Sequence, residues 1–166
     1  MRRRDLMMGG AALLSVAGCA SQSKFKRYNG PDVTFVVVNK DERRMHLFHN
    51  DDVLKSYDIQ LGFAPVGPKQ FEGDGKTPEG LYRINRRNPN SKFHLSLGIS
   101  YPNVRDYAEA KAAGKEPGGD IFIHGQKNPF VRDDGDWTWG CIAVTNKEME
   151  EIYAMVKNDT LIQLNA

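Results

Sequence analysis

Two residues with complementary chemistry, His124 and Cys141, stand at the ends of two short apolar runs. The run at 121–123 leads directly into His124, and Cys141 leads directly into a second run at 142–144. The thiolate is the nucleophilic form of cysteine, and a nearby imidazole can stabilise it or accept the proton of the thiol. The pattern predicts a Cys141 nucleophile working across two neighbouring strands with His124, which is either a general base or the imidazolium partner of an ion pair.

The residues around this pair suit the same chemistry. Gly140 allows close backbone approach, so the amides of Gly140 and Cys141 are candidates for stabilising a developing oxyanion. A backbone carbonyl near Gly125 is a candidate for fixing the tautomer of His124, since the imidazole needs a second partner for that purpose. Thr138 is a candidate to hydrogen-bond within the loop or to substrate.

Other uses of cysteine, histidine and glycine fit the sequence less well. The chain has no paired Cys or His at metal-ligand spacing, so we expect neither a metal nor another cofactor. In papain-type hydrolases the cysteine precedes the histidine, whereas His124 comes first here. The Gly-Lys-Thr at 75–77 lacks the upstream glycine that a phosphate-binding loop requires, and Pro78 blocks a helix starting at Lys76.

Several motifs resemble the catalytic domain of the L,D-transpeptidases, also called the YkuD domain. They are GDGKTPEGLY at 73–82, ISYPN at 99–103, GGD at 118–120, and the His-Gly of 124–125 with TWGCI at 138–142. The ISYPN and GGD stretches are most similar to the YafK branch, whose members are murein-acting enzymes of the bacterial envelope. The resemblance covers roughly residues 33–164, and its specificity comes from several motifs in a fixed order.

The resemblance implies a β-rich domain whose Cys141 attacks the carbonyl of the L-centred third residue, a diamino acid, of a peptidoglycan stem peptide. A thioacyl-enzyme would then pass its acyl group to an amine in transpeptidation or to water in hydrolysis. YafK-like members are linked with cleaving the bond between a stem peptide and an attached protein, so a peptidoglycan-attached protein is a further candidate partner. A function of another class stays open, namely a catalytically silent lipoprotein that binds peptidoglycan in the same cleft.

The chain departs from the broader family at two places beside the thiol. Ala143 and Val144 follow Gly-Cys-Ile, where many members carry Arg directly after it, and Trp139 precedes Gly140, where His is common. Both changes alter the acceptor side and the surroundings of the thiol while leaving nucleophile and base in place. Hydrolysis is therefore a serious competitor to transpeptidation.

Four further side chains are candidates for substrate contacts. Trp137 and Trp139 flank the nucleophile motif, and either of them can line the cleft or pack in the core. Arg132 and Lys69 are candidates to meet the carboxylates of a stem peptide. For these two, solvated surface charge is the alternative interpretation.

The first residues have the pattern of an export signal. Three arginines precede an apolar stretch at 6–17, which is well short of the ~20 residues of a transmembrane helix. LSVAGC at 14–19 resembles a bacterial lipobox, which predicts a lipoprotein signal peptide at 1–18 and lipid on Cys19. RRDLM at 3–7 also resembles a twin-arginine signal, and an ordinary cleaved signal is the alternative. We expect the cell envelope or periplasm, and Ala20 in place of an inner-membrane retention Asp favours the outer membrane.

Charge and cysteine usage narrow the possible partners. Residues 1–18 hold three Arg and one Asp, so the formal charge of +2 belongs to the leader and the remainder is neutral. Without a basic stripe no nucleic acid is expected, and the membrane is met only through the N-terminal lipid. Cys141 would be alone in an oxidising compartment, which indicates a reactive thiol, with an inert buried cysteine as the alternative.

Residues 19–31 are interpreted as a polar tether and residues 32–166 as a single catalytic domain. The β-branched run at 33–38, together with 44–48 and 53–61 around a polar turn, predicts an antiparallel meander. Further strands are expected at 80–85, with Leu81 and Ile84 as its apolar residues, at 93–100, with Phe93, Leu95, Leu97 and Ile99 on one face, and at 160–164.

Two helices complete the predicted fold. One is expected at 103–113, ended by Gly114, and another follows the capping box of Thr145 and Glu148. The segment 62–77 is expected to be a long functional loop. The other histidines are interpreted as surface residues; they are His46, His49 and His94. The whole predicts a mainly β (α+β) domain with a sandwich-like mixed sheet and one or two helices.

Overall fold

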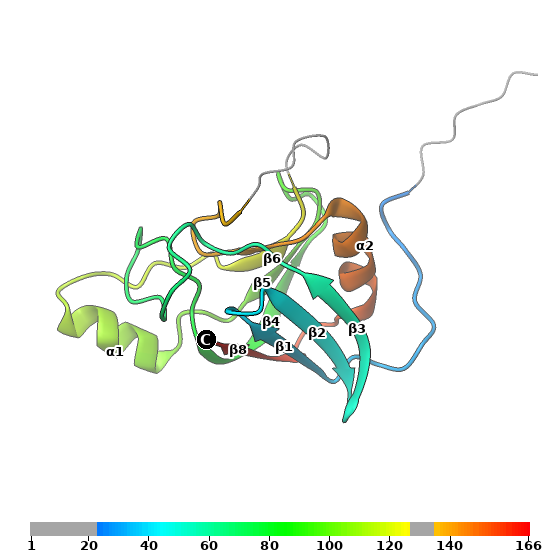
Figure 1. The fold of residues 1–166 in the computed structure, drawn as a ribbon, viewed down its shortest axis with the longest axis horizontal. Coiled ribbons are helices and arrows are strands. Elements are labelled where there is room, and N and C mark those ends of the chain that lie inside the picture. The colour runs from blue at the N-terminus through cyan, green and yellow to red at the C-terminus, as the bar shows by residue number, and fades with distance from the viewer. Residues whose placement is uncertain (1–22, 127–134) are drawn as a thin grey trace, which may run out of the picture.

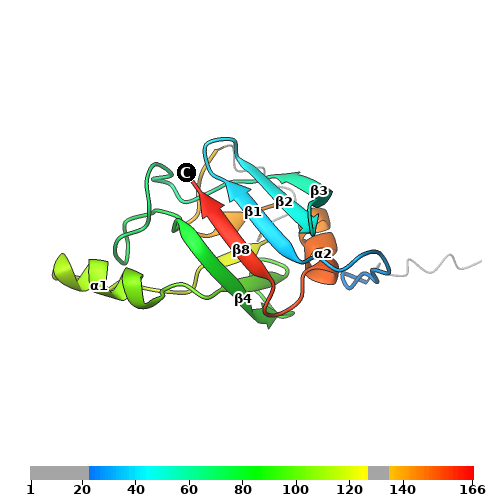
Figure 2. The ribbon, with the colours of Figure 1, turned by 90° about the horizontal axis from the view of Figure 1, so that it is seen from below.

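The computed structural model describes residues 23–126 and 135–166, so Cys19 and Arg132 lie outside the described residues. Eight strands of the described residues form one mixed sheet in the order β3-β2-β1-β8-β4-β5-β6-β7 (Figures 1 and 2). The strands are β1 (Phe35–Asn39), β2 (Arg44–His49), β3 (Asp52–Asp58), β4 (Gly80–Asn88), β5 (Ser96–Ile99), β6 (Phe122–His124), β7 (Ile142–Ala143) and β8 (Leu161–Asn165). The helices are α1 (Val104–Ala112) and α2 (Asn146–Met155).

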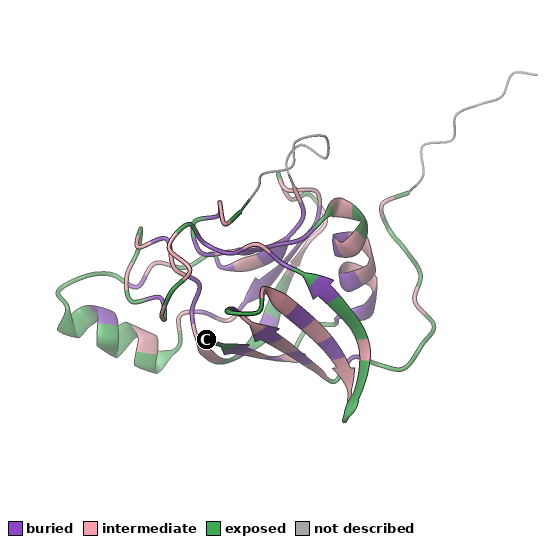
Figure 3. Ribbon diagram, in the orientation of Figure 1, coloured by how far each residue is buried: buried purple, intermediate pink, exposed green. Residues whose placement is uncertain are grey.

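The N-terminal part of the sheet confirms the predicted meander. β2 pairs antiparallel with both β1 and β3, and Asn50 makes the turn with a positive φ of 52°, a conformation that asparagine tolerates. Burial alternates along β1 and β2 (Figure 3), and Val36, Val38, Met45 and Leu47 are wholly buried. The period of two in the sequence therefore sets which face of the meander covers the core.

The last strand of the chain lies in the middle of the sheet. β8 runs parallel to β1 and antiparallel to β4, and it buries Ile162 and Leu164. β4 joins the two halves of the sheet, because its first residues pair with β8 and its last ones with β5. The register shifts between Ile84 and Arg86, at the change of partner. An irregularity of this kind bends a strand, so the sheet turns over at β4.

The two ends of the sheet meet just beyond β3. Gln60 and Ala143 of β7 exchange two backbone hydrogen bonds of 2.9 and 2.8 Å. Gly62 forms a parallel bridge with Thr138, supported by hydrogen bonds from Phe63 N to the Thr138 carbonyl (3.0 Å) and from Thr138 N to the Leu61 carbonyl (3.1 Å). The sheet thus curls until β7 lies beside the continuation of β3, which agrees with the expected sandwich-like fold.

Two predicted strands are wrong in detail. In β4 it is Tyr82 that shares the buried face with Ile84, while Leu81 is 54% exposed, because positions two apart share a face and neighbours do not. β5 begins at Ser96, three residues later than predicted. Phe93 and His94 precede it in a loop where His94 has a positive φ of 73°, which is incompatible with a strand.

Both helices begin where capping signals predict, and α1 also ends where its glycine predicts. Asn103 and Thr145 cap α1 and α2, each with a capping box, and Gly114 follows α1 with a φ of 68°. α2 packs over β5 and β6 through Met149 and Ile152. α1 buries Ala110 and projects from the sheet (Figure 1). No helix of the described residues has both the length and the apolar character needed to cross a membrane.

A buried ion pair joins the meander to the loop at 62–77. Lys40, just after β1, is 1% exposed, and its Nζ lies 2.7 Å from Glu79 Oε1. The same ammonium donates to the carbonyls of Gly67 (2.7 Å) and Thr77 (3.3 Å). A charge this deeply buried requires such a set of partners, so Lys40 fixes the loop relative to the sheet.

We expect Lys40→Met to lower the free energy of unfolding by about 3 kcal/mol, because it removes one member of a buried pair and leaves the others unsatisfied. Chemical denaturation measures this. Lys55→Met is the matched control, since Lys55 is 51% exposed and pairs with Glu151 at 3.6 Å. That control should change stability by less than about 0.5 kcal/mol. Equal effects of the two substitutions would contradict a special role for Lys40.

Candidate active site

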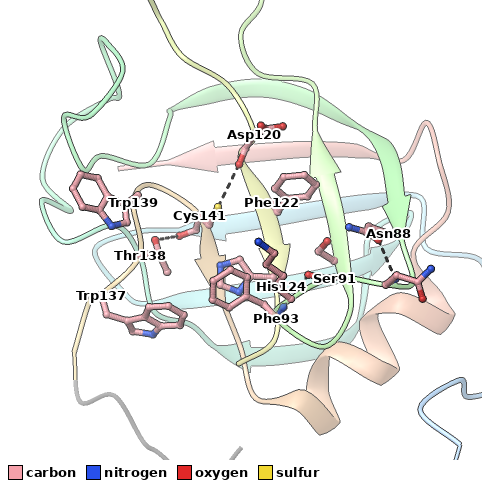
Figure 4. A pocket seen from close by; sticks show the side chains of 13 residues that line it. Asn88, Ser91, Phe93, Asp120, Phe122, His124, Trp137, Thr138, Trp139 and Cys141 are labelled. Atoms are coloured by element: carbon pink, nitrogen blue, oxygen red, sulfur yellow. Dashed lines mark hydrogen bonds between the residues drawn. The ribbon is translucent and has the colours of Figure 1, made fainter. Parts of the chain in front are cut away.

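The pairing of β6 with β7 brings Cys141 and His124 to one face of the sheet. The two strands run parallel, with Ile123 beside Ile142 and His124 beside Ala143. Both isoleucines are wholly buried in the core, so the alternating positions, His124 on β6 and Cys141 just before β7, share the opposite face. Figure 4 shows both side chains on the wall of one cavity, which they line together.

The imidazole of His124 is oriented by the backbone, as the sequence suggested. Its Nδ1 lies 2.6 Å from the carbonyl oxygen of Gly125. A carbonyl only accepts hydrogen bonds, so Nδ1 carries the proton and Nε2 of the neutral ring is left as the basic nitrogen. The side chain is 4% exposed. Burial lowers the pKa of His124, against the opposing effect of the Gly125 carbonyl, and the ring is therefore neutral near pH 7.

Two aromatic rings enclose the imidazole. The centroid of Phe93 lies 4.6 Å from that of His124 with the rings inclined at 30°, and Trp137 approaches at 5.7 Å edge-on. Phe93 and Trp137 also contact each other, at 5.9 Å. Phe93 was assigned to the apolar face of a strand on sequence grounds. The structure instead places it over the candidate base, in the loop before β5 and next to the positive φ of His94.

The thiol of Cys141 is also held in its neutral form. Its Sγ lies 3.5 Å from the carbonyl oxygen of Asp120 and donates to it. Burial raises the pKa of the thiol, and the nearby Asp120 carboxylate adds to this, while Lys69 and the backbone at Phe122 oppose it. Asp120 has a φ of 56°, a left-handed conformation that is uncommon outside glycine and that accompanies this carbonyl orientation. A neutral thiol and a neutral imidazole therefore line the same cavity.

Thr138 organises the turn that precedes the thiol. Its Oγ1 donates to the carbonyl of Cys141 (2.7 Å) and accepts from the amide of Gly140 (3.2 Å). Thr138 is 3% exposed, so its hydroxyl serves the loop. The Gly140 amide, a candidate oxyanion donor on sequence grounds, is engaged by this hydroxyl.

Two glycines allow three loops to pack backbone against backbone at this turn. A Cβ on Gly140, whose φ is 113°, would lie 2.4 Å from the carbonyl oxygen of Lys76. A Cβ on Gly62 would lie 2.1 Å from the carbonyl oxygen of Gly75 and 2.9 Å from the Gly140 nitrogen. Larger residues would force these segments apart. Gly140 thus allows a close approach between loop backbones, and Gly62 shares this role; the part of Gly140 in binding an oxyanion stays a prediction.

Lys69 takes part in a buried ion pair of the 62–77 loop. Its Nζ lies 2.9 Å from Asp74 Oδ1 and 3.0 Å from the carbonyl oxygen of Phe71. Burial alone would raise the pKa of Asp74, but Lys69 and the amides of Gln70, Lys76 and Phe71 together hold it below its ordinary value. Lys69 is 5% exposed, so the alternative interpretation of Lys69 as a solvated surface charge is wrong. Its ammonium is already paired with Asp74.

The cavity beside the pair has a volume of about 470 Å³ and mainly apolar walls. One wall is the loop between β4 and β5, which contributes residues that the sequence analysis did not single out as site residues; they are Asn88, Asn90, Ser91, Lys92 and Phe93. Trp137 and Trp139 line the opposite side (Figure 4). Trp139 is 71% exposed and meets Phe63 edge-on at 5.0 Å, so it is not a core residue.

The remaining histidines have partners elsewhere. His46 Nδ1 lies 2.7 Å from Ser56 Oγ, and His49 Nδ1 lies 2.8 Å from the carbonyl of Asp32, both at the partly exposed outer strands. His94 is not on a strand face, as noted above, and its Nε2 pairs with Glu150 at 2.9 Å. Within residues 23–126 and 135–166, no group of three or more His, Cys, Asp or Glu converges as a metal site.

Comparison with known protein families identifies the family to which a chain with this site belongs. The sequence pattern of the YkuD family, described as the L,D-transpeptidase catalytic domain, matches residues 33–164. The chain belongs to this family. Over 129 residues this YkuD domain is 30% identical to the Escherichia coli (strain K12) protein named as L,D-transpeptidase YafK, an overlap of 74% of this chain and 46% of that protein. The chain thus spans about half the length of the curated relatives it matches.

Solved structures carry the same YkuD fold. Pgp2 from Campylobacter jejuni, described as a helical cell shape determining protein, superposes with a TM-score of 0.63 at 29% identity, covering 82% of this chain and 49% of Pgp2. An L,D-transpeptidase from Mycobacterium smegmatis superposes with a TM-score of 0.55 at 14% identity, covering 81% and 59% of the two chains. The second likeness shows the fold alone.

The neutral state of the thiol predicts how Cys141 responds to pH. In a Cys19→Ser background, Cys141 is the only thiol of the chain. We expect its alkylation by iodoacetamide to accelerate from pH 6 to beyond pH ~9 without levelling, because burial raises the thiol pKa above its ordinary range. Stopped samples analysed by mass spectrometry give the rate. A plateau below pH 7 would instead indicate a thiolate–imidazolium pair.

The ring of Phe93 predicts a change in the candidate base. Phe93→Ala should raise the pKa of His124 toward its ordinary value, because water reaches an imidazole whose pKa is lowered by burial. An NMR titration of the His124 ring measures the change. Trp139→Ala is the control, since it removes an exposed ring that packs on Phe63, and it should leave the titration in place. An unchanged pKa in Phe93→Ala would contradict the assigned role.

Proposed function

We propose that the chain is an envelope enzyme that cleaves or exchanges a bond in peptidoglycan stem peptides through a thioacyl-enzyme at Cys141. The observation that carries the proposal is a partly buried thiol just before β7 and a buried imidazole on the adjacent β6 of a YkuD domain, lining one cavity. A module that only binds peptidoglycan needs neither the nucleophile nor an imidazole whose tautomer is fixed by Gly125.

In the proposed reaction, Nε2 of His124 takes the proton of Cys141 as Sγ attacks the carbonyl of the L-centred third residue of the stem. A general base suits this start, because burial raises the pKa of the thiol and lowers the pKa of the imidazole. The resulting imidazolium then protonates the departing amine, and the thioester remains on Sγ. Water or an amine acceptor, deprotonated by His124, attacks the thioester and restores the thiol.

We assign the oxyanion to the Cys141 amide, since Thr138 engages the amide of Gly140. One preorganised donor of this kind is typically worth ~10²–10³ in rate. Trp139 and Phe63, which are 71% and 48% exposed, form a platform next to the thiol for the group that leaves or enters. A contact of Arg132 with a stem carboxylate stays a prediction.

Hydrolysis and transpeptidation share the acyl-enzyme and differ in the acceptor. Ala143 is wholly buried and bonded to Gln60, and Val144 is 3% exposed. An arginine directly after Gly-Cys-Ile, as in many family members, would have to fit this closed position. The acceptor side therefore lacks that cation, which supports hydrolysis as a major outcome, with a peptidoglycan-attached protein among the candidate leaving groups.

We also propose that the protein is exported and held at the membrane through lipid on Cys19. The lipobox-like sequence at 14–19 supports this assignment. The Escherichia coli and Campylobacter jejuni relatives are named for an L,D-transpeptidase and for cell shape determination, and an envelope location agrees with both names.

The deciding experiment incubates the full-length chain with purified cell-wall sacculi, with Cys141→Ala alongside, and identifies the digested products by mass spectrometry. We expect the native protein, and not the variant, to change the stem peptides. New links between third residues would establish transpeptidation, and released amino acids, peptides or attached protein without new links would establish hydrolysis. Identical products from both proteins would leave a peptidoglycan-binding module as the function.

A further inference from the structure

Residues 23–31 lie against the catalytic domain although their sequence predicts only a polar tether. They form no helix or strand, and their path follows α2 (Figures 1 and 2). The ring of Phe25 lies 6.4 Å from that of Tyr153 on α2, and Lys26 Nζ lies 3.5 Å from Glu150. These contacts come from a segment in which most residues are exposed (Figure 3), so specific side chains hold it in place.

Lys24 makes the contact that reaches furthest toward the active site. Its Nζ donates to the carbonyl of Pro89 (2.6 Å) and to the carbonyl of His94 (3.2 Å). The two acceptors stand at the two ends of one short loop between β4 and β5. A single ammonium that bonds both ends fixes the width of the loop, and hydrogen bonds from a charged donor are about twice as strong as neutral ones.

The same loop is anchored on α2 by groups that also hold the N-terminal segment. Glu150 accepts from His94 Nε2 at 2.9 Å and pairs with Lys26. Arg87, near the end of β4, stacks on Tyr153 with its Cζ 4.0 Å from the ring centroid, and Tyr153 is the ring that Phe25 meets. The segment, the loop and α2 therefore form one cluster.

The inner side of this loop is a wall of the active site. Residues 90–93 line the cavity, and the Phe93 ring lies 4.6 Å from His124. The Lys24 bonds thus act on the backbone that carries both the cavity wall and the ring over the candidate base. Lys24 does not itself line the cavity.

We propose that Lys24 is a positioning residue, and that the N-terminal segment 23–26 is an outer support of the active site. Its ammonium holds the loop at 88–94 in the shape that receives the substrate and seats Phe93 on His124. The effect on turnover rests on the proposed function. The effect on the loop does not.

The test compares Lys24→Met with Arg27→Met in the full-length protein. Both remove one positive charge from the same N-terminal stretch, but Arg27 is exposed and lies outside residues 23–26. For Lys24→Met we expect amide hydrogen exchange within residues 90–95 to accelerate roughly ten-fold or more, since two charge-assisted bonds are lost. We expect KM for a stem peptide to rise by a similar factor with kcat less affected, and Arg27→Met to stay within about two-fold for both.

Several outcomes would overturn the proposal. Unchanged exchange within residues 90–95 would do so, and so would acceleration spread evenly over β1, β8 and the loop, which would indicate general loss of stability. A peptide KM that stays constant while the loop loosens would remove the link to the active site. If native protein turns over no stem peptide while Lys24→Met still loosens the loop, the proposed function fails and the support role of Lys24 stands.

Discussion

The closure of the sheet by residues 60–62 is the constraint on which the site depends. β7 consists of two residues, too few to hold a nucleophile in place alone. Its Ala143 is paired on one side with His124 and on the other with Gln60, and Thr138 is held between Leu61 and Phe63. The turn that carries Cys141 is thus clamped from both edges of a curled sheet. Gly62 and Gly140 make the clamp possible, because any side chain there would strike backbone.

This clamp also sets the electrostatics of the pair. Enclosing Cys141 and His124 between strands and aromatic rings removes water, which disfavours the charged form of each group and moves the two pKa values apart. The resting site then holds one proton on sulfur and one on Nδ1, where the Gly125 carbonyl retains it. In the proposed reaction charge would appear only when a substrate carbonyl is attacked, so desolvation favours a base mechanism over a permanent ion pair. The uncommon φ of Asp120 fits the same arrangement, because its carbonyl gives the neutral thiol an acceptor.

The features of the fold that depend on local rules could be predicted from the sequence. Alternation predicted β1 and β2, and capping residues predicted where both helices begin. The ordered motifs predicted which thiol and which imidazole would lie on adjacent segments and line one cavity. It failed where distant segments decide the outcome. Tyr82 carries a polar hydroxyl but is buried, because that hydroxyl donates to Asp106 (3.1 Å). Lys69 is buried because its ammonium pairs with the Asp74 carboxylate. The cavity wall at 88–93 was missed, since its role follows from how α2 and the N-terminal segment hold a loop whose residue types are common in any turn.

If lipid is attached to Cys19 as proposed, the contacts of Lys24 limit how far the catalytic domain can lie from the membrane. Lys24 stands five positions after Cys19, and an extended chain advances ~3.4 Å per residue, so the backbone of Lys24 can lie no more than roughly 20 Å from the point of attachment. A flexible tether beginning at the domain boundary near residue 31 would allow about twice that reach. Contact of residues 23–26 with the domain would therefore shorten the distance over which the domain can move from the membrane, and would restrict its orientation. With lipid on Cys19, the wall of the cavity would be kept near the membrane surface. The substrate would then have to reach a site whose distance from that surface is limited by the contacts of Lys24, the residue proposed to shape the cavity.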